Sequence, residues 1–128
     1  MAESFAESNY ENAVLQLLKE RLGYTYVYGP DVERDYHSPL YEDLLLPCLQ
    51  RVNKGLSMNA LNEAIYKLKN FETGTLLQKN MVFMDYLQNG VPVKYMDNGE
   101  ERAGLVYLID FENASNNEFA VVNQWTFI

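Results

Sequence analysis

The chain has 128 residues, a length that suits one domain with a modest hydrophobic core. Hydrophobic residues make up 48% of the sequence and aromatic residues 13%, a composition that excludes a disordered or low-complexity chain. The net charge of -8 argues against broad, non-specific attraction to nucleic-acid phosphate.

The cysteine content and the hydropathy pattern indicate the compartment. A single cysteine, Cys48, cannot form an internal disulfide and lacks the partners that a zinc site needs. The sequence shows no signal peptide and no apolar run long enough to span a membrane. We therefore expect a cytoplasmic protein without a membrane segment.

The first elements in chain order are a helix and a short strand. Ser8 and Glu11 have the spacing of a helix capping box, and Gly23 stands where a helix C-terminal cap belongs. Between them, apolar residues repeat at helical spacing. The next segment, Tyr24–Tyr28, alternates in the manner of a short strand. A helix from Ser8 to Gly23 and a strand after it are therefore predicted.

Three more helices are predicted before the C-terminal third. The first opens at Ser38-Pro39, and Pro47 inside its apolar run predicts a kink or a break. The next is capped by Ser57 and places Leu61, Ala64, Ile65 and Leu68 toward a core. The last spans Thr75–Gln88 and stops at Gly90.

The final stretch, Val91–Ile128, predicts a hairpin followed by a third strand. Asn98-Gly99 supplies the positive φ angles that a tight reversal needs. Leu105–Ile109 and Phe119–Ile128 are apolar at odd and even positions alike, which is typical of central strands covered on both faces. A three-stranded sheet portion that stops in mid-sheet is therefore expected.

This order of elements predicts the α+β class, with helices packed on a mixed β-sheet. No linker, internal repeat or low-complexity tract divides the sequence. We expect one domain over residues 1–128. Within it, residues 1–90 would be mainly helical with one short strand, and residues 91–128 would form the three-stranded sheet portion.

Few residues carry an obvious chemistry. The sequence contains no Gly-rich phosphate loop, no metal-spaced His or Cys set and no nucleophile elbow. His37 stands in a polar loop beside Asp35, and we interpret it as a solvated residue and not as a base. Cys48 lies among leucines and is interpreted as a small core residue. Trp125 is interpreted as a core anchor.

Two acidic positions each allow two interpretations. Glu11 is either a helix cap or a carboxylate that points into a site, and its spacing from Ser8 favours the cap. Asp110 and Glu112 follow a strand and could hold a hard cation such as magnesium. The same segment is rich in the Asn, Ser and Asp residues that turns use, and the turn is favoured.

Several phrases of the sequence occur in a characteristic order. The most specific are Leu108-Ile109-Asp110-Phe111 and, further on, Asn116–Gln124. The supporting positions are Glu11 with Leu22-Gly23-Tyr24, the segment Leu49–Asn53, Asn80 and Asn89–Val93. In this order, and over nearly the whole chain, they resemble the N-terminal region of the R subunit (HsdR) of type I restriction enzymes.

The resemblance implies a partial PD-(D/E)xK, restriction-endonuclease-like fold at the front of a DNA-translocating ATPase. The parent would couple ATP-dependent translocation to magnesium-dependent endonucleolytic cleavage of DNA in restriction-modification defence. Its implied cofactors are Mg and ATP, and its implied partners are DNA and the methylation and specificity subunits. Of the family's catalytic residues, only the first-helix carboxylate has a candidate here, Glu11.

The sequence departs from the family pattern at the other site positions. Pro30-Asp31 is the only Pro-Asp pair and precedes the helices, no acid-x-Lys motif follows Asp110, and no Walker sequence appears. We therefore expect a chain truncated before the catalytic strands, inactive by itself and weak in DNA binding. Its exposed sheet edge predicts self-association.

The alternative is a stand-alone acidic binding or regulatory module without catalysis. The reading frame beyond Ile128 discriminates the two hypotheses, since a fragment would continue into a Pro-Asp strand and an acid-x-Lys strand.

Overall fold

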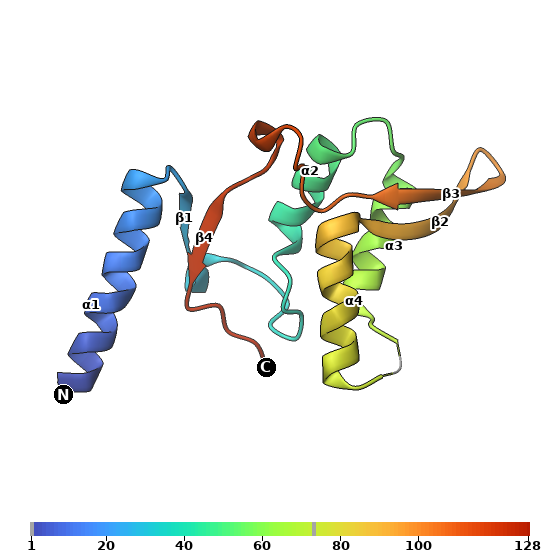
Figure 1. Cartoon of the computed structure of the whole chain (residues 1–128). Helices are drawn as coiled ribbons and strands as arrows, with labels where there is room; N and C mark the ends of the chain where they lie inside the picture. Colours follow the sequence, from blue (N-terminus) through green and yellow to red (C-terminus); the bar gives the residue numbers. More distant parts are fainter. Residues whose placement is uncertain (1, 73) are drawn as a thin grey trace. The chain divides into compact units, whose positions relative to one another are not determined.

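The computed structural model describes residues 2–72 and 74–128, which fall into two compact units whose elements Figure 1 labels. The terminal unit combines the chain up to Pro39 with Glu118–Ile128. The central unit is Leu40–Asn117. Each unit is described by itself below. The expectation of one domain over residues 1–128 stays a prediction.

Two helices of the central unit begin where the sequence predicts them. The hydroxyl of Ser57 accepts a hydrogen bond from the backbone of Ala60 and caps α3 (Met58–Lys69). Thr75 and Gln78 form a capping box at the start of α4 (Leu76–Asn89), with hydrogen bonds of 2.8 and 3.2 Å. Local side-chain bonds satisfy the first N–H groups of each helix, so both starts are determined locally.

The first helix of this unit, α2 (Glu42–Val52), corrects one prediction. It begins at Glu42, about four residues after Ser38, and Tyr41 is its N-cap residue. The backbone N–H of Ser38 instead donates to the carbonyl of Asp35 in a turn. The helix is not broken at Pro47, which lies inside it. Proline there costs one backbone hydrogen bond, which the rest of the helix tolerates.

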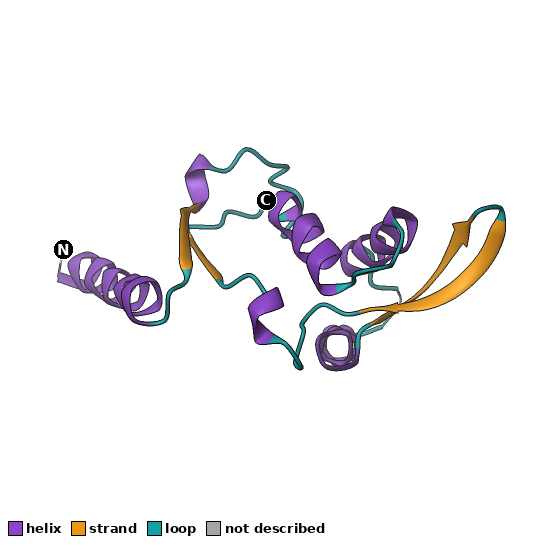
Figure 2. Cartoon of the chain, turned by 90° about the horizontal axis from the view of Figure 1, so that it is seen from above, coloured by secondary structure: helices purple, strands orange, loops and turns teal. Residues whose placement is uncertain are grey.

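The hairpin of the central unit joins β2 (Val91–Asp97) to β3 (Glu100–Val106) in an antiparallel pair, drawn in Figure 2 as the longer of the two strand pairs. Asn98 has φ +52° and Gly99 has φ +80°, so both central residues of the turn lie in the left-handed region. This confirms the predicted Asn-Gly reversal.

The core of the central unit forms where α3 packs against β2. Gly90 connects α4 directly to β2. Its φ is +93°, a conformation that favours glycine, and a Cβ atom there would lie 2.9 Å from the Leu105 side chain. The buried apolar cluster consists of Leu49, Ala60, Leu61, Ala64, Val91, Val93 and Val106. The predicted inward face of α3 is thereby confirmed, since Leu68 is also buried and Ile65 packs against the cluster.

The prediction of a central strand over Leu105–Ile109 is wrong. β3 ends at Val106, and Leu105 and Tyr107 are exposed. The reason is Asn53, which is buried at the end of α2 and bonds both backbone groups of Tyr107, at 2.7 and 2.8 Å. The Asn53 side chain thus occupies the backbone N–H and C=O of Tyr107, which a longer β3 would need for pairing with its neighbour.

The terminal unit begins with α1 (Ala2–Gln16), which continues as a π-helical segment over Leu17–Arg21. Because α1 starts before Ser8, the predicted capping box of Ser8 and Glu11 is wrong: both residues lie inside the helix. The predicted end is confirmed, since Gly23 has φ +73° and the N–H of Tyr24 bonds back to the carbonyl of Leu18.

The sheet of this unit pairs the two ends of the sequence. β1 (Thr25–Tyr28) runs parallel to β4 (Ala120–Asn123), with Tyr28 opposite Asn123. The expected three-stranded sheet over residues 91–128 is therefore wrong, because the third strand pairs with β1 and not with the hairpin. Gln124 follows β4 with φ +48°, a conformation that ends the strand well before Ile128.

The fold is thus of the predicted α+β class. In place of one mixed sheet, it contains a parallel pair and an antiparallel pair, each in its own unit. Among the described residues, no helix combines the length and the hydropathy that crossing a membrane would require.

Candidate functional site

Glu11 lies on α1 and contacts the end of β4. Its Oε1 accepts a hydrogen bond of 2.8 Å from Nδ2 of Asn123, and its side chain is half-buried. The two residues are separated by 112 positions in the sequence. A carboxylate in the middle of a helix, bonded to a strand end, has no capping role. The capping interpretation of Glu11 is therefore wrong, and the interpretation as a carboxylate that points into a site stays a prediction.

Gly29, directly after β1, completes the contact. Its backbone N–H donates to Oδ1 of Asn123 at 3.4 Å, so the Asn123 side chain joins α1 to the end of β1. A Cβ atom on Gly29 would lie 2.1 Å from the carbonyl oxygen of Asn123. The close approach of the two chain segments therefore requires glycine at this position.

Glu11, Asn123 and Gly29, which we call the carboxylate cluster, lie at the carboxyl ends of two parallel strands. In open sheets with parallel strands, this end is where ligand sites form. Within the part of the chain that the structure describes, Oε2 of Glu11 accepts no hydrogen bond. One oxygen of the carboxylate is thus held while the other is available.

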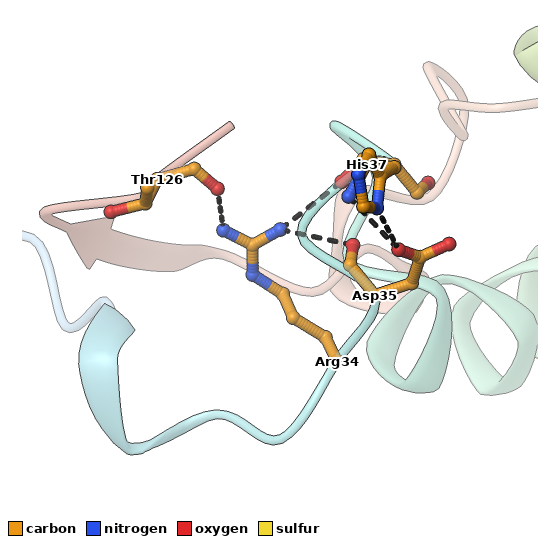
Figure 3. A network of polar contacts seen from close by, with 5 residues as sticks. Arg34, Asp35, His37 and Thr126 are labelled. Carbon is orange, nitrogen blue, oxygen red and sulfur yellow. Dashed lines mark hydrogen bonds and ion pairs between the residues drawn. The ribbon is translucent and has the colours of Figure 1, made fainter. Parts of the chain in front are cut away.

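A second polar network surrounds Arg34 in the same unit (Figure 3). Its guanidinium lies 3.6 Å from the ring centre of Trp125 and 4.6 Å from that of Tyr36. It also donates to the carbonyl oxygens of Thr126 and Ser38. The Trp125 indole N–H donates to the carbonyl of Pro39 over 2.8 Å. Trp125 is therefore an anchor for a cation and not for the apolar core.

His37 is a solvated residue, as the sequence predicts, whereas Cys48 lies outside the buried apolar cluster and is not the core residue that was expected. His37 is exposed, and its ring nitrogen lies 3.1 Å from the Asp35 carboxylate (Figure 3). Cys48 is half-buried on α2, where Arg51 lies 3.8 Å from its sulfur.

Asp110 forms a turn, as the favoured interpretation predicts. Its carboxylate accepts hydrogen bonds from the backbone of Asn113 and Glu112 and from the side chain of Asn116. The bond from Asn113 contributes most to holding the pKa of this carboxyl below its ordinary value, followed by the bond from Asn116. Because its lone pairs are used within the turn, Asp110 is a structural residue here.

No group of three or more metal-ligating side chains comes together in the described parts of the chain. Oxygen-rich clusters are what Mg²⁺ requires, and one carboxylate with an amide does not supply it. The carboxylate cluster therefore does not by itself supply the ligands of a magnesium site.

A profile of the family described as "Type I restriction enzyme R protein N terminus" matches residues 4–128. The match covers the helices, both strand pairs and the carboxylate cluster. The chain belongs to this family. The resemblance inferred from its short phrases is therefore confirmed.

The chain is also similar to two proteins from other organisms. The chain is 32% identical over 121 residues to the "Putative type I restriction enzyme MjaIXP endonuclease subunit" of Methanocaldococcus jannaschii, with 90% of the chain covered. It is 31% identical over 126 residues to the "Type I restriction enzyme HindI endonuclease subunit" of Haemophilus influenzae, with 92% covered. The chain spans 12% of the length of each of these relatives. No solved structure matches it.

Sequence reasoning identified Glu11 but missed its neighbours. Asn123 was part of a family phrase, and no sequence pattern indicated a site role for Gly29. Periodicity cannot pair positions so far apart, because it reports neighbours within one element.

Proposed function

We propose that this chain is part of the nuclease region of a type I restriction enzyme R subunit, and that Glu11 is a carboxylate of its cleavage site. The parent would translocate DNA by using ATP, and it would cleave DNA in a reaction that depends on Mg²⁺. The region would have a partial PD-(D/E)xK fold. The observation that carries the proposal is the position of Glu11, on the first helix and at the carboxyl ends of β1 and β4, with one oxygen available.

The described residues do not fit a complete Mg²⁺ site, so no step of cleavage is derived through the metal. In this proposal, the chain contributes one carboxylate to the cleavage site, that of Glu11, and Asn123 holds it in place. Metal-dependent hydrolysis needs further carboxylates and a Lys to position or activate water. In the parent these would come from a Pro-Asp strand and an acid-x-Lys strand outside the present sequence.

Replacing Glu11 in the full R subunit, assembled with its methylation and specificity subunits, tests the proposal. Glu11→Gln keeps the size of the side chain and removes its charge. We expect DNA cleavage to fall by orders of magnitude, while ATP hydrolysis and translocation stay at the level of the unmodified subunit. Glu7→Gln, one helical turn away on the exposed surface of α1, is the matched control and should leave cleavage unchanged. A stable Glu11→Gln subunit with full cleavage would contradict the proposal.

The partners and the state of the 128-residue chain follow from the same proposal. The chain by itself would neither cut DNA nor hydrolyse ATP, and its net charge of -8 favours weak binding to DNA. Self-association through an open edge of the β1–β4 pair also stays a prediction. A pair of strands leaves backbone groups on its outer edges available for another chain.

A further inference from the structure

The side-chain amide of Asn123 has one orientation imposed on it. Its Nδ2 faces the Glu11 carboxylate, which only accepts hydrogen bonds, and its Oδ1 faces the Gly29 N–H, which only donates. Turning the amide over would place two acceptors together and two donors together. The side-chain amide of Asn123 therefore presents its N–H donor to Glu11 in a fixed orientation.

The same contact limits the freedom of Glu11. A glutamate on a helix surface samples several rotamers, and ordering it costs side-chain entropy. Here Oε1 accepts a hydrogen bond from Asn123. The Asn123 side chain in turn accepts one from the backbone N–H of Gly29, directly after β1. The carboxylate is thus held by Asn123 of β4, and its second oxygen is left without a hydrogen-bond partner among the described residues.

We infer that Asn123 is a positioning residue for Glu11: it holds one carboxylate oxygen so that the other stays available to the cleavage site. Gly29 acts with it, because any side chain at that position would displace the end of β4. The inference rests on the proposed function of Glu11. Asn123 has no contact with a reacting atom in this arrangement and acts through Glu11.

Two substitutions of Asn123 in the full R subunit test the inference. Asn123→Asp is isosteric and keeps an acceptor for Gly29, but it removes the donor to Glu11. Asn123→Ser is neutral and too short to reach Glu11. Loss of a group that orients a site carboxylate typically costs roughly 10–100-fold in activity. We expect that loss in the turnover rate of DNA cleavage for both variants, with the KM for DNA and the rate of ATP hydrolysis unchanged.

Two further variants separate positioning from stability. Glu11→Gln combined with Asn123→Asp rebuilds the contact with the donor and acceptor exchanged, so thermal stability should return while cleavage stays low. Asn70→Asp is the matched control, since Asn70 is the exposed C-cap residue of α3 and its amide donates to the backbone carbonyl of Tyr66. It should leave cleavage unchanged.

The outcomes distinguish the two proposals. If Glu11→Gln abolishes cleavage while Asn123→Asp and Asn123→Ser turn over at the normal rate, the inference is overturned and the proposed function stands. If both Asn123 variants lose ATP hydrolysis together with cleavage, Asn123 is structural and the inference is overturned. If Glu11→Gln cleaves DNA normally, the proposed function fails and the inference fails with it.

Discussion

The central and terminal units are stabilised by different kinds of contact. In the central unit, apolar side chains of α2, α3 and the hairpin pack into one buried cluster. In the described part of the terminal unit, no large apolar side chain is fully buried, and the buried positions are Gly29 and Ser38. Contacts there are polar and specific, such as Glu11 with Asn123 and Arg34 with Trp125.

This difference indicates where function can be placed. Apolar burial is non-directional, so it stabilises a scaffold without fixing the orientation of a polar group. Hydrogen bonds have strict geometry and can hold a carboxylate in one position. The central unit therefore has the character of a scaffold, and the proposed site carboxylate lies in the terminal unit. Three predictions test this comparison.

The largest expected effect concerns the core of the central unit. Leu61 is 1% exposed and lies in the apolar cluster. Leu61→Ala should lower the free energy of unfolding by about 2–5 kcal/mol, because it removes buried methyl groups and leaves a cavity. Urea denaturation of the chain measures this. Tyr66→Ala, at a position 63% exposed on the same helix, is the control and should change it by about 0.5 kcal/mol or less. Equal effects would contradict the scaffold role.

A smaller effect is expected for the Arg34 network of the terminal unit. Arg34→Met keeps most of the apolar stem but removes the cation from the Trp125 ring and its bonds to backbone carbonyls. The free energy of unfolding should fall by about 1–2 kcal/mol. The emission of Trp125, the only tryptophan, reports the change directly. Arg21→Met on the same unit is the control, and an unchanged emission spectrum for Arg34→Met would argue against the network.

The smallest effect concerns the turn at Asp110. Its folded-state pKa is lower than its ordinary value of 3.8, chiefly because of the Asn113 hydrogen bond. The unfolded chain therefore binds this proton more readily than the folded chain does. The stabilising contribution is fully present above the unfolded-state value, and it is lost as pH falls through the lowered folded-state pKa.

An NMR titration of the Asp110 side chain measures this pKa, and its midpoint should fall below 3.8. Asp110→Asn should remove this part of the acid dependence of stability, since an amide accepts the same backbone bonds without titrating. A midpoint at or above the ordinary value would show that the turn does not prefer the charged carboxylate.

Local structure followed from local sequence in the central unit. Ser57 caps the helix that it was predicted to cap, α4 begins at the predicted position beside Thr75, and Asn98-Gly99 makes the predicted turn. Each of these features depends on side chains within a few residues of the backbone groups that they satisfy. The Asp110 turn belongs to the same class, since all the donors to the Asp110 carboxylate lie within six residues of it.

Where strands end and which strands pair were decided by distant residues. Asn53 ended β3 by bonding Tyr107, 54 positions away, although the apolar pattern alone predicted a longer strand. β4 paired with β1 and not with the adjacent hairpin. An apolar pattern predicts that other elements will cover the faces of a strand, but it does not specify which strand pairs with it.

The sequence by itself determined the α+β class, the starts of α3 and α4, the hairpin turn and the family, because these depend on neighbouring residues or on short phrases in a fixed order. It also identified Glu11 as the candidate carboxylate. Only the tertiary structure excluded the capping alternative for Glu11. The helix begins before Ser8, and the carboxylate bonds Asn123, 112 positions away. Such a contact exists only after β1 and β4 have paired, so no local pattern encodes it.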